Sequence, residues 1–338
     1  MSRRRFLALS AATLTGLPWR SRAHQEQLGA ISLSKRRADA RGRFESHAAQ
    51  SKKKDSTLQA LVATVSATRL QSAVDGLVAL QTRWSLASNF SLATQWIQRA
   101  FVDAGFQEEA INRQNFVMPD GRTLSNVVCL PEHPEAGYAL ICAHYDSVSE
   151  MPSSTAPGAD DNASGIAVML EVARVLRTAN LKRGVMFVAF AGEEQGLIGS
   201  EAAAKAAASE HWPLDVVINL DMVGWVDPQR PLVITVEFDQ GNSNPKNDAA
   251  AKAFGLQLAQ VVADYTPLSV EHTDIWNSDY MPFERIGSPC IGVYDGGADA
   301  KYYHTSADTP SVVNVERLVH VAGALVAFVA QLSGQPSA

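Results

Sequence analysis

Histidine and acidic residues occur at five places in this 338-residue chain where an apolar run ends or a loop begins. These residues are His144, the pair Asp160-Asp161, the pair Glu193-Glu194, Asp221 and His304. Two imidazoles and three carboxylates make a nitrogen and oxygen ligand set that zinc accepts. A carboxylate shared between two ions would hold them roughly 3.5–4 Å apart, the arrangement of two-metal hydrolytic sites. A further acid beside the ions could take a proton from water and later pass it to a leaving amine.

The apolar patterns around these residues predict alternating strands and helices. Strands are predicted at 116–118, 125–130, 138–144, 184–191, 216–222, 232–238 and 290–294, and helices at 58–65, 70–80, 91–104, 166–177, 197–208, 249–263 and 315–332. This alternation indicates an α/β fold with a mixed, largely parallel central sheet covered by helices on both faces. Ligands of such sheets bind at the carboxyl ends of the strands. We therefore expect His144, which ends one strand, Glu193-Glu194, which follow a second, and Asp221, near the end of a third, to meet at one edge.

Charge is distributed unevenly along the chain. The formal net charge is −6, but residues 1–54 hold 13 lysines and arginines against three acids, so the remainder carries about −16. A globular part this acidic argues against a nucleic-acid ligand. No apolar run is long enough to be a clear transmembrane helix, so we expect no stable membrane span. Cys129, Cys142 and Cys290 show no disulfide framework; Cys129 and Cys142 could pair, but buried free thiols are favoured.

The N-terminal residues have the pattern of an export signal. Residues 1–23 contain Arg3-Arg4-Arg5, a mildly apolar run at 6–17 and small residues before a cleavage point after Ala23. The run SRRRFL resembles a twin-arginine signal, which predicts an exported, periplasmic or extracellular protein. The alternative is a cytosolic protein with a chance basic start. Residues 24–55 are polar and lack an apolar period, which is typical of a flexible linker, so the folded domain is expected at 56–335.

Five motifs follow one another along this expected domain. They are HYDS at 144–147, PGADDNASG at 157–165, AFAGEEQGLIGS at 189–200, NLDMVG at 219–224 and YYHTSADT at 302–309. In this order they resemble the motifs of the zinc-dependent aminopeptidase family, whose members are di-zinc exopeptidases of the bacterial leucyl-aminopeptidase type, with glutaminyl cyclases as distant relatives. The resemblance runs from about residue 58 to 332 and implies a zinc-exopeptidase fold (phosphorylase/hydrolase-like).

The resemblance implies a role for each residue of the candidate centre. Asp160 would bridge two Zn²⁺ ions, although other divalent metals are possible. One ion would also take His144 and Asp221, and the other Glu194 and His304. Glu193 would remain unbound and act as general base and then as general acid.

The resemblance also implies supporting roles around the ions. Asp146 would orient the first histidine, and Asp308 would play a similar part near His304. Asp161 would be a neighbour constrained by the turn, and the Asp160–Asp161 peptide would be cis.

Aromatic and apolar residues in the last third of the chain are candidates for the substrate pocket. Tyr280, Phe283, Ile291 and Tyr294 could line a pocket for the first side chain of a peptide, although core packing explains them about equally well. Some relatives place an oxyanion-stabilising tyrosine in this region, at a position that falls near Ser288 here. Tyr280, Tyr294, Tyr302 or Tyr303 could substitute for it, and the sequence does not choose among them.

The expected function is that of a metallo-exopeptidase, an aminopeptidase above all. It would hydrolyse the first peptide bond of peptides with a free amino terminus, using a hydroxide that two zinc ions activate. One alternative is a glutaminyl-cyclase-like acyltransferase with a single zinc ion. The other is a non-catalytic binding domain on the same scaffold.

Overall fold

One mixed sheet of eight strands forms the centre of the part of the chain that the computed structural model describes, which is residues 55–131, 137–241, 243–296 and 300–334. The strands are β1 (Ile111–Val117), β2 (Thr123–Cys129), β3 (Tyr138–His144), β4 (Gly184–Phe190), β5 (Leu214–Leu220), β6 (Val233–Phe238), β7 (Ser269–Thr273) and β8 (Cys290–Tyr294). Their order across the sheet is β1-β2-β4-β3-β5-β8-β6-β7. The export signal expected at 1–23 lies outside the described residues, as does the linker expected at 24–55 except for Asp55.

The four central strands are parallel. β3 lies between β4 and β5, with His144 opposite Phe190 in the register, and β5 pairs with β8. β2 and β6 join this core antiparallel, which makes the whole sheet mixed. Every residue of β3 and β4 is buried, as strands covered on both faces require. The expected fold class is therefore confirmed.

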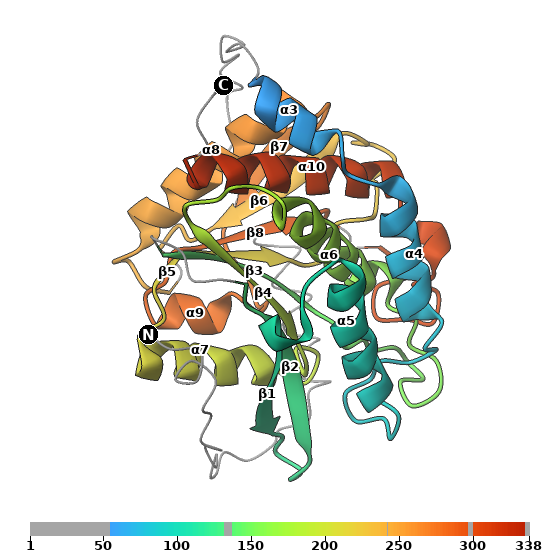
Figure 1. Cartoon of the computed structure of the whole chain (residues 1–338). Helices are drawn as coiled ribbons and strands as arrows, with labels where there is room; N and C mark the ends of the chain where they lie inside the picture. The colour runs from blue at the N-terminus through green and yellow to red at the C-terminus, as the bar shows by residue number, and fades with distance from the viewer. Residues whose placement is uncertain (1–54, 132–136, 242, 297–299, 335–338) are drawn as a thin grey trace.

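Helices cover both faces of the sheet (Figure 1). The described helices are α3 (Ser56–Val62), α4 (Ala67–Val78), α5 (Ser91–Asp103), α6 (Gly165–Leu176), α7 (Ile198–Glu210), α8 (Asp248–Tyr265), α9 (Met281–Arg285) and α10 (Val315–Leu332). Side chains of β3 alternate between the faces, so Ile141 packs in the core beneath α4, α5, α6, α8 and α10, while Leu140 and Cys142 pack toward α7 and α9. Two apolar layers thus hold the sheet rigidly from either side.

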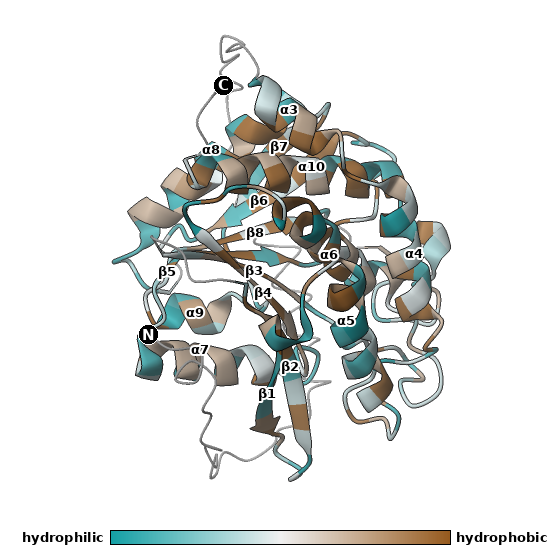
Figure 2. Ribbon diagram, in the orientation of Figure 1, coloured by the Kyte–Doolittle hydropathy of each residue, from teal (hydrophilic) through white to brown (hydrophobic). Residues whose placement is uncertain are grey.

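The apolar colouring concentrates in these layers, on the central strands, α6 and α10 (Figure 2). Among the described residues, α10 is the one helix long and apolar enough to cross a membrane, and 67% of it is buried inside the protein. Burial against α6, α8 and the sheet explains its composition. All three cysteines are buried and free, as expected.

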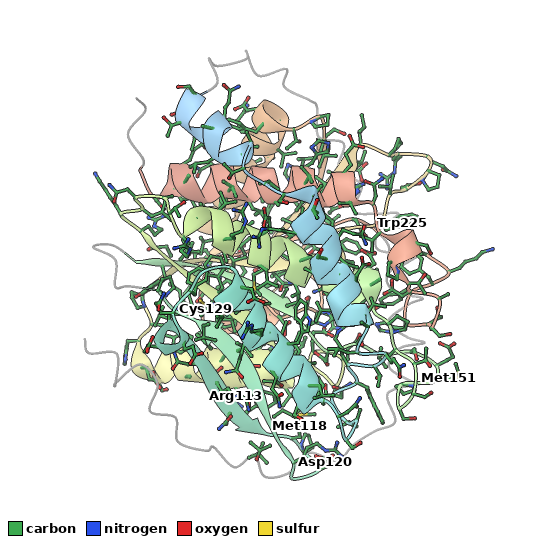
Figure 3. All side chains as sticks on the ribbon, turned by 45° about the vertical axis from the view of Figure 1, so that its right-hand side comes forward. Arg113, Met118, Asp120, Cys129, Met151 and Trp225 are labelled. Carbon is green, nitrogen blue, oxygen red and sulfur yellow. The ribbon has the colours of Figure 1, made fainter. Side chains whose placement is uncertain are left out.

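The sequence patterns failed mainly at the sheet edges. β1 begins at Ile111, five residues before the strand expected there, because polar residues such as the buried Gln114 also stand on its covered face and remove the apolar alternation. Arg113 and Asp120 both lie on the β1–β2 hairpin (Figure 3). The edge strand β7 and the five-residue helix α9 were not expected at all.

Candidate active site

The parallel strands bring the candidate residues to one edge of the sheet. His144 is the last residue of β3, Glu193 and Glu194 follow β4, and Asp221 follows β5. Because these three strands are parallel neighbours, their carboxyl ends lie side by side. His304 reaches the same place from the loop after β8, with a left-handed φ of 55°.

Two histidines face one shared carboxylate at the centre of the site. His144 Nε2 lies 3.3 Å from Asp161 Oδ1 and 3.3 Å from Asp221 Oδ1. His304 Nε2 lies 3.1 Å from Asp161 Oδ2 and 3.3 Å from Glu194 Oε2. Each oxygen of Asp161 therefore serves a different histidine, and each histidine has one further carboxylate of its own. The geometry is that of two adjoining ligand groups with Asp161 in common.

This geometry corrects the expectation that Asp160 is the shared carboxylate. Asp160 Oδ1 accepts a hydrogen bond from Gly224 N at 2.9 Å, and its Oδ2 accepts one from Tyr302 Oη at 2.7 Å. Both its oxygens are therefore engaged away from the histidines. The cis peptide bond is likewise Asp161–Asn162, not Asp160–Asp161. Two adjacent acids in a tight turn contact different surroundings, and their order in the sequence does not reveal which one faces the site.

Glu193 and Glu194 are placed by a buried carboxylate beneath them. Asp146 Oδ1 accepts from Glu193 N and Asp146 Oδ2 accepts from Glu194 N, each at 3.2 Å. Ser85 Oγ donates to the same Oδ2 at 2.9 Å. Orientation of His144 comes from the backbone of Asp146, whose carbonyl oxygen lies 3.1 Å from His144 Nδ1, while its carboxylate is 3.8 Å away.

Asp308 positions the turn and not the second histidine. Its two oxygens accept hydrogen bonds from the backbone amides of Asp160, at 2.9 Å, and Asp161, at 3.0 Å. The expectation that it orients His304 is therefore replaced by a different role. The neighbour of His304 is the ring of Tyr303, which stacks on the imidazole with ring centroids 3.8 Å apart.

Sequence reasoning missed the contact that holds Asp221. Ser278 Oγ donates to Asp221 Oδ2 at 2.6 Å, and Asn219 Nδ2 donates to Ser278 Oγ at 2.8 Å. Only the topology brings these residues together, because Ser278 precedes α9 and lies 57 positions from Asp221. Ser85, Tyr302 and Ser278 share this property: each holds a site carboxylate across a long sequence separation.

Three of the four expected pocket residues belong to the core. Phe283 and Ile291 have no exposed surface, and the ring of Phe283 packs 6.0 Å from that of Phe190. Tyr280 is equally buried, and its hydroxyl donates to Glu237 Oε2 at 2.8 Å. Core packing therefore accounts for these residues, Ile291 on one face of the sheet and Tyr280 and Phe283 on the other. Tyr294 lies in a separate apolar cluster next to the site, with Met222, Tyr302 and partly buried neighbours that include Tyr303.

The buried charges of the site depend strongly on one another. Burial opposes ionisation of Asp161, but hydrogen bonds to His144 and His304 hold its pKa well below the usual range. Burial raises the pKa of Glu193 well above its usual range; His144 opposes this shift and Glu194 adds to it. Without bound metal, Asp161 therefore favours its ionised form, whereas Glu193 favours its protonated form.

The donor set fits zinc. Each group offers one imidazole nitrogen and carboxylate oxygens, within 4.8 Å of one another, which is the hard-to-borderline mixture that zinc binds. Among the described residues, a third group, His144 with Glu193 and Glu194, meets the same criterion and overlaps the first two. The residues present are therefore sufficient to hold metal at this edge of the sheet.

The sequence profile of peptidase family M28 matches residues 126–329, which include all of these candidate ligands. A probable zinc metalloprotease from Pyrenophora tritici-repentis is 33% identical over 193 residues, which cover 50% of this chain and 44% of that protein. Aminopeptidase YwaD from Bacillus subtilis is 32% identical over 194 residues, which cover 55% of this chain and 39% of that protein. The match thus spans less than half the length of both relatives.

Solved structures share the fold at low identity. The LapA aminopeptidase of Legionella pneumophila superposes with a TM-score of 0.71 at 20% identity, covering 85% of this chain and 78% of that one. The glutaminyl cyclase of Porphyromonas gingivalis superposes with a TM-score of 0.65 at 20% identity, covering 79% and 99%. One scaffold thus carries a peptidase and a cyclase, so the fold alone does not choose between these two chemistries.

Proposed function

We propose that this chain, which belongs to the zinc-dependent peptidase family M28, is a metallo-exopeptidase that releases the first residue of peptides with a free amino terminus. One observation carries the proposal: both oxygens of Asp161 face histidines, and each histidine has a second carboxylate beside it. A shared carboxylate between two ligand groups suits a pair of ions better than a single one. The name of the relative YwaD supports the choice of aminopeptidase.

The two proposed metal positions share one ligand. His144, Asp161 and Asp221 would hold one Zn²⁺, and Asp161, Glu194 and His304 would hold the other. When bound, zinc supplies Lewis acidity, which polarises a carbonyl group and makes water acidic enough to attack it near neutral pH. Other divalent ions that accept nitrogen and oxygen ligands could occupy the same positions.

Glu193 is the proposed general base and acid. Its backbone amide is fixed by Asp146, and its carboxylate lies beside His144 and Glu194 without belonging to either ligand group. Without bound metal, burial raises its pKa well above the usual range. A carboxylate beside the two metal positions that binds neither ion can accept a proton from water. The same proton can then pass to the amine that leaves when the peptide bond breaks.

Tyr303 is the proposed donor to the oxyanion that forms on the substrate carbonyl. Of the tyrosines considered, Tyr280 and Tyr302 donate their hydroxyl protons to Glu237 and Asp160. Tyr303 instead stacks on the ligand His304, and burial together with the nearby Asp161 raises its pKa well above the usual range. It therefore stays protonated, as a hydrogen-bond donor to a developing negative charge must.

The rival function is that of a glutaminyl-cyclase-like acyltransferase with one zinc ion. The structural similarity to the Porphyromonas gingivalis enzyme favours it. Against it, His144 and Asp221 complete a second ligand group, which a single-metal enzyme does not need. A non-catalytic binding domain has no comparable support, because every residue of both groups is in place.

The test combines zinc quantitation with matched substrates. An aminopeptidase should contain two Zn²⁺ per chain, cleave leucyl and alanyl anilides, and leave the same anilides intact when their amino group is acetylated. Glutaminyl peptides should lose their first residue without forming pyroglutamate. Pyroglutamate formation with one zinc per chain would establish the cyclase instead, and absence of both reactions would leave only a binding function.

We also propose that residues 1–23 direct export before residues 56–335 act outside the cytoplasm. The basic start and the SRRRFL run carry this proposal. Replacing Arg4 and Arg5 with lysine in the full chain should retain the protein in the cytoplasm of a bacterial host, whereas unchanged export would remove the twin-arginine assignment.

A further inference from the structure

A short segment outside the family match reaches into the site. Residues 81–85 connect α4 to the loop before α5 and lie more than 40 positions before residue 126, where the match begins. Their backbone is bound to the loop that precedes the shared carboxylate: Ala156 N donates to Gln81 O at 2.9 Å, and Ser147 N donates to Arg83 O at 3.2 Å. Residues 81–85 are therefore hydrogen-bonded to both ends of the loop at residues 147–156.

Arg83 is the largest fully buried side chain of this segment. Its Nε donates to Tyr145 O at 2.9 Å, Nη1 to Pro157 O at 2.6 Å and Nη2 to Gly158 O at 2.8 Å. Nη1 also lies 3.3 Å from Leu77 O, near the end of α4. All four acceptors are backbone carbonyls, an unusual environment for a buried guanidinium, which normally pairs with a carboxylate.

Three of these carbonyls, those of Tyr145, Pro157 and Gly158, lie on two chain segments that each supply one residue of the same ligand group. Tyr145 directly follows His144, and Gly158 precedes Asp161 by three residues. One planar guanidinium with fixed donor directions therefore determines how far apart these two segments lie. The guanidinium of Arg83 also packs closely against Gly158, because a Cβ atom added at Gly158 would lie 2.8 Å from Arg83 Nη2.

The charge of Arg83 is balanced by the site acids at a distance. Burial lowers the pKa of Arg83 to about 10, while Asp308, Asp146 and Asp161 favour its charged form. It is therefore a cation at neutral pH, surrounded by acids that it does not touch through a hydrogen bond. The same attraction favours ionisation of those acids, which metal binding requires.

We propose that Arg83 is a positioning residue of the metal site, whose guanidinium fixes the separation of His144 and Asp161. Ser85 is a second positioning residue. Its hydroxyl donates to Asp146, whose carboxylate accepts from the backbone amides of Glu193 and Glu194. The inference rests on the metal-binding function proposed above. It assigns part of the site to residues 81–85, which the family profile does not match.

Arg317 provides a matched control. It is also buried, on α10, and both its Nη atoms donate to a single backbone carbonyl, Val233 O, at 2.8 and 2.7 Å. Val233 is the first residue of β6, a strand that contains none of the candidate metal ligands. A substitution of Arg317 should therefore report the cost of disturbing a buried arginine without moving a ligand.

The experiment compares Arg83→Lys with Arg317→Lys in the full chain. Lysine keeps the charge but presents one ammonium group, which cannot span carbonyls on separate segments. We expect zinc affinity, measured on metal-free protein by competition with a chelating indicator, to fall at least 10-fold in Arg83→Lys. In Arg317→Lys it should stay within twofold of wild type, although the melting temperature Tm falls in both variants. An affinity within twofold of wild type in Arg83→Lys would overturn the proposal.

Ser85→Ala keeps the proposal testable if Arg83→Lys does not fold. It removes one hydroxyl and should weaken zinc binding severalfold, whereas Ser333→Ala, which removes a buried hydroxyl bonded to Val329 O, should not. Equal affinity in both serine variants and wild type would contradict the positioning role of residues 81–85. If wild type itself binds no zinc, the metal-binding function and this inference fail together.

Discussion

Exchanging the two neighbouring acids for amides gives a sharp test of the site geometry. In Asp161→Asn one of the two oxygens becomes an amide nitrogen, which cannot bind zinc. Because Oδ1 faces His144 at 3.3 Å and Oδ2 faces His304 at 3.1 Å, either orientation of the amide deprives one metal position of a ligand. We expect the zinc content to fall from two per chain to one or fewer.

The size of the effect follows from the type of contact. Disturbing groups that only support metal ligands costs about 10–100-fold in affinity, so losing a ligand and its negative charge should cost about 100-fold or more. Asp160→Asn instead leaves either Gly224 N or Tyr302 Oη facing an amide group. A buried donor without an acceptor costs about 1–3 kcal/mol of folding stability. This variant should melt earlier yet retain both metals.

Zinc per chain, measured after dialysis, and the free energy of unfolding should therefore separate the two variants. Asp161→Asn should lose metal and turnover together, whereas Asp160→Asn should lose stability first. If Asp160→Asn released its zinc while Asp161→Asn kept two ions and normal turnover, the assignment of the shared carboxylate would be wrong.

Three further predictions concern catalysis and pH. Glu193→Gln should keep its fold and zinc but lower kcat on leucyl anilide by about 10²–10⁴-fold, because only proton transfer is removed; full activity would contradict the base assignment. Tyr303→Phe should lower kcat by about 10²–10³-fold at unchanged zinc content, since it removes one oxyanion donor; an unchanged kcat would return this role to another group. In metal-free protein, burial raises the pKa of Asp279 and of Asp308 to about 7, whereas the pKa of an unfolded aspartate is about 3.9. The contribution of these two groups to the free energy of unfolding is therefore present below pH 4 and is lost as the pH rises toward 7. The Tm of chelator-treated protein should therefore be lower at pH 8 than at pH 5, and the opposite order would show that other groups dominate.

Much of the fold could be predicted from the chain because buried parallel strands have an unmistakable pattern. β4 is an unbroken apolar run, and β8 and α10 begin and end where the sequence indicates. β7 could not be predicted, because an edge strand of five residues with polar side chains, SVEHT, has no periodic signal. Helix α9 is too short for a helical period to be recognised.

The sequence predicts which residues belong to the candidate site but not how their side chains are oriented. Histidine and acids after parallel strands must meet at one edge, so His144, Glu193, Glu194 and Asp221 could be grouped in advance. Which of Asp160 and Asp161 faces the histidines depends on backbone angles within one turn, where Asp161 has φ −102° and ψ 87°. The contacts of Arg83 with Tyr145 and Gly158 depend on tertiary packing across 62 and 75 positions. No local pattern carries that information.

We propose that this chain uses two metal ions, joined by Asp161, to hydrolyse peptides from the amino terminus. Zinc titrated into metal-free protein, with leucyl-anilide hydrolysis followed at each addition, tests it most directly. Activity should reach its maximum near two equivalents of zinc per chain, and further zinc should add nothing. Full activity at one equivalent, or none at any zinc concentration, would contradict it.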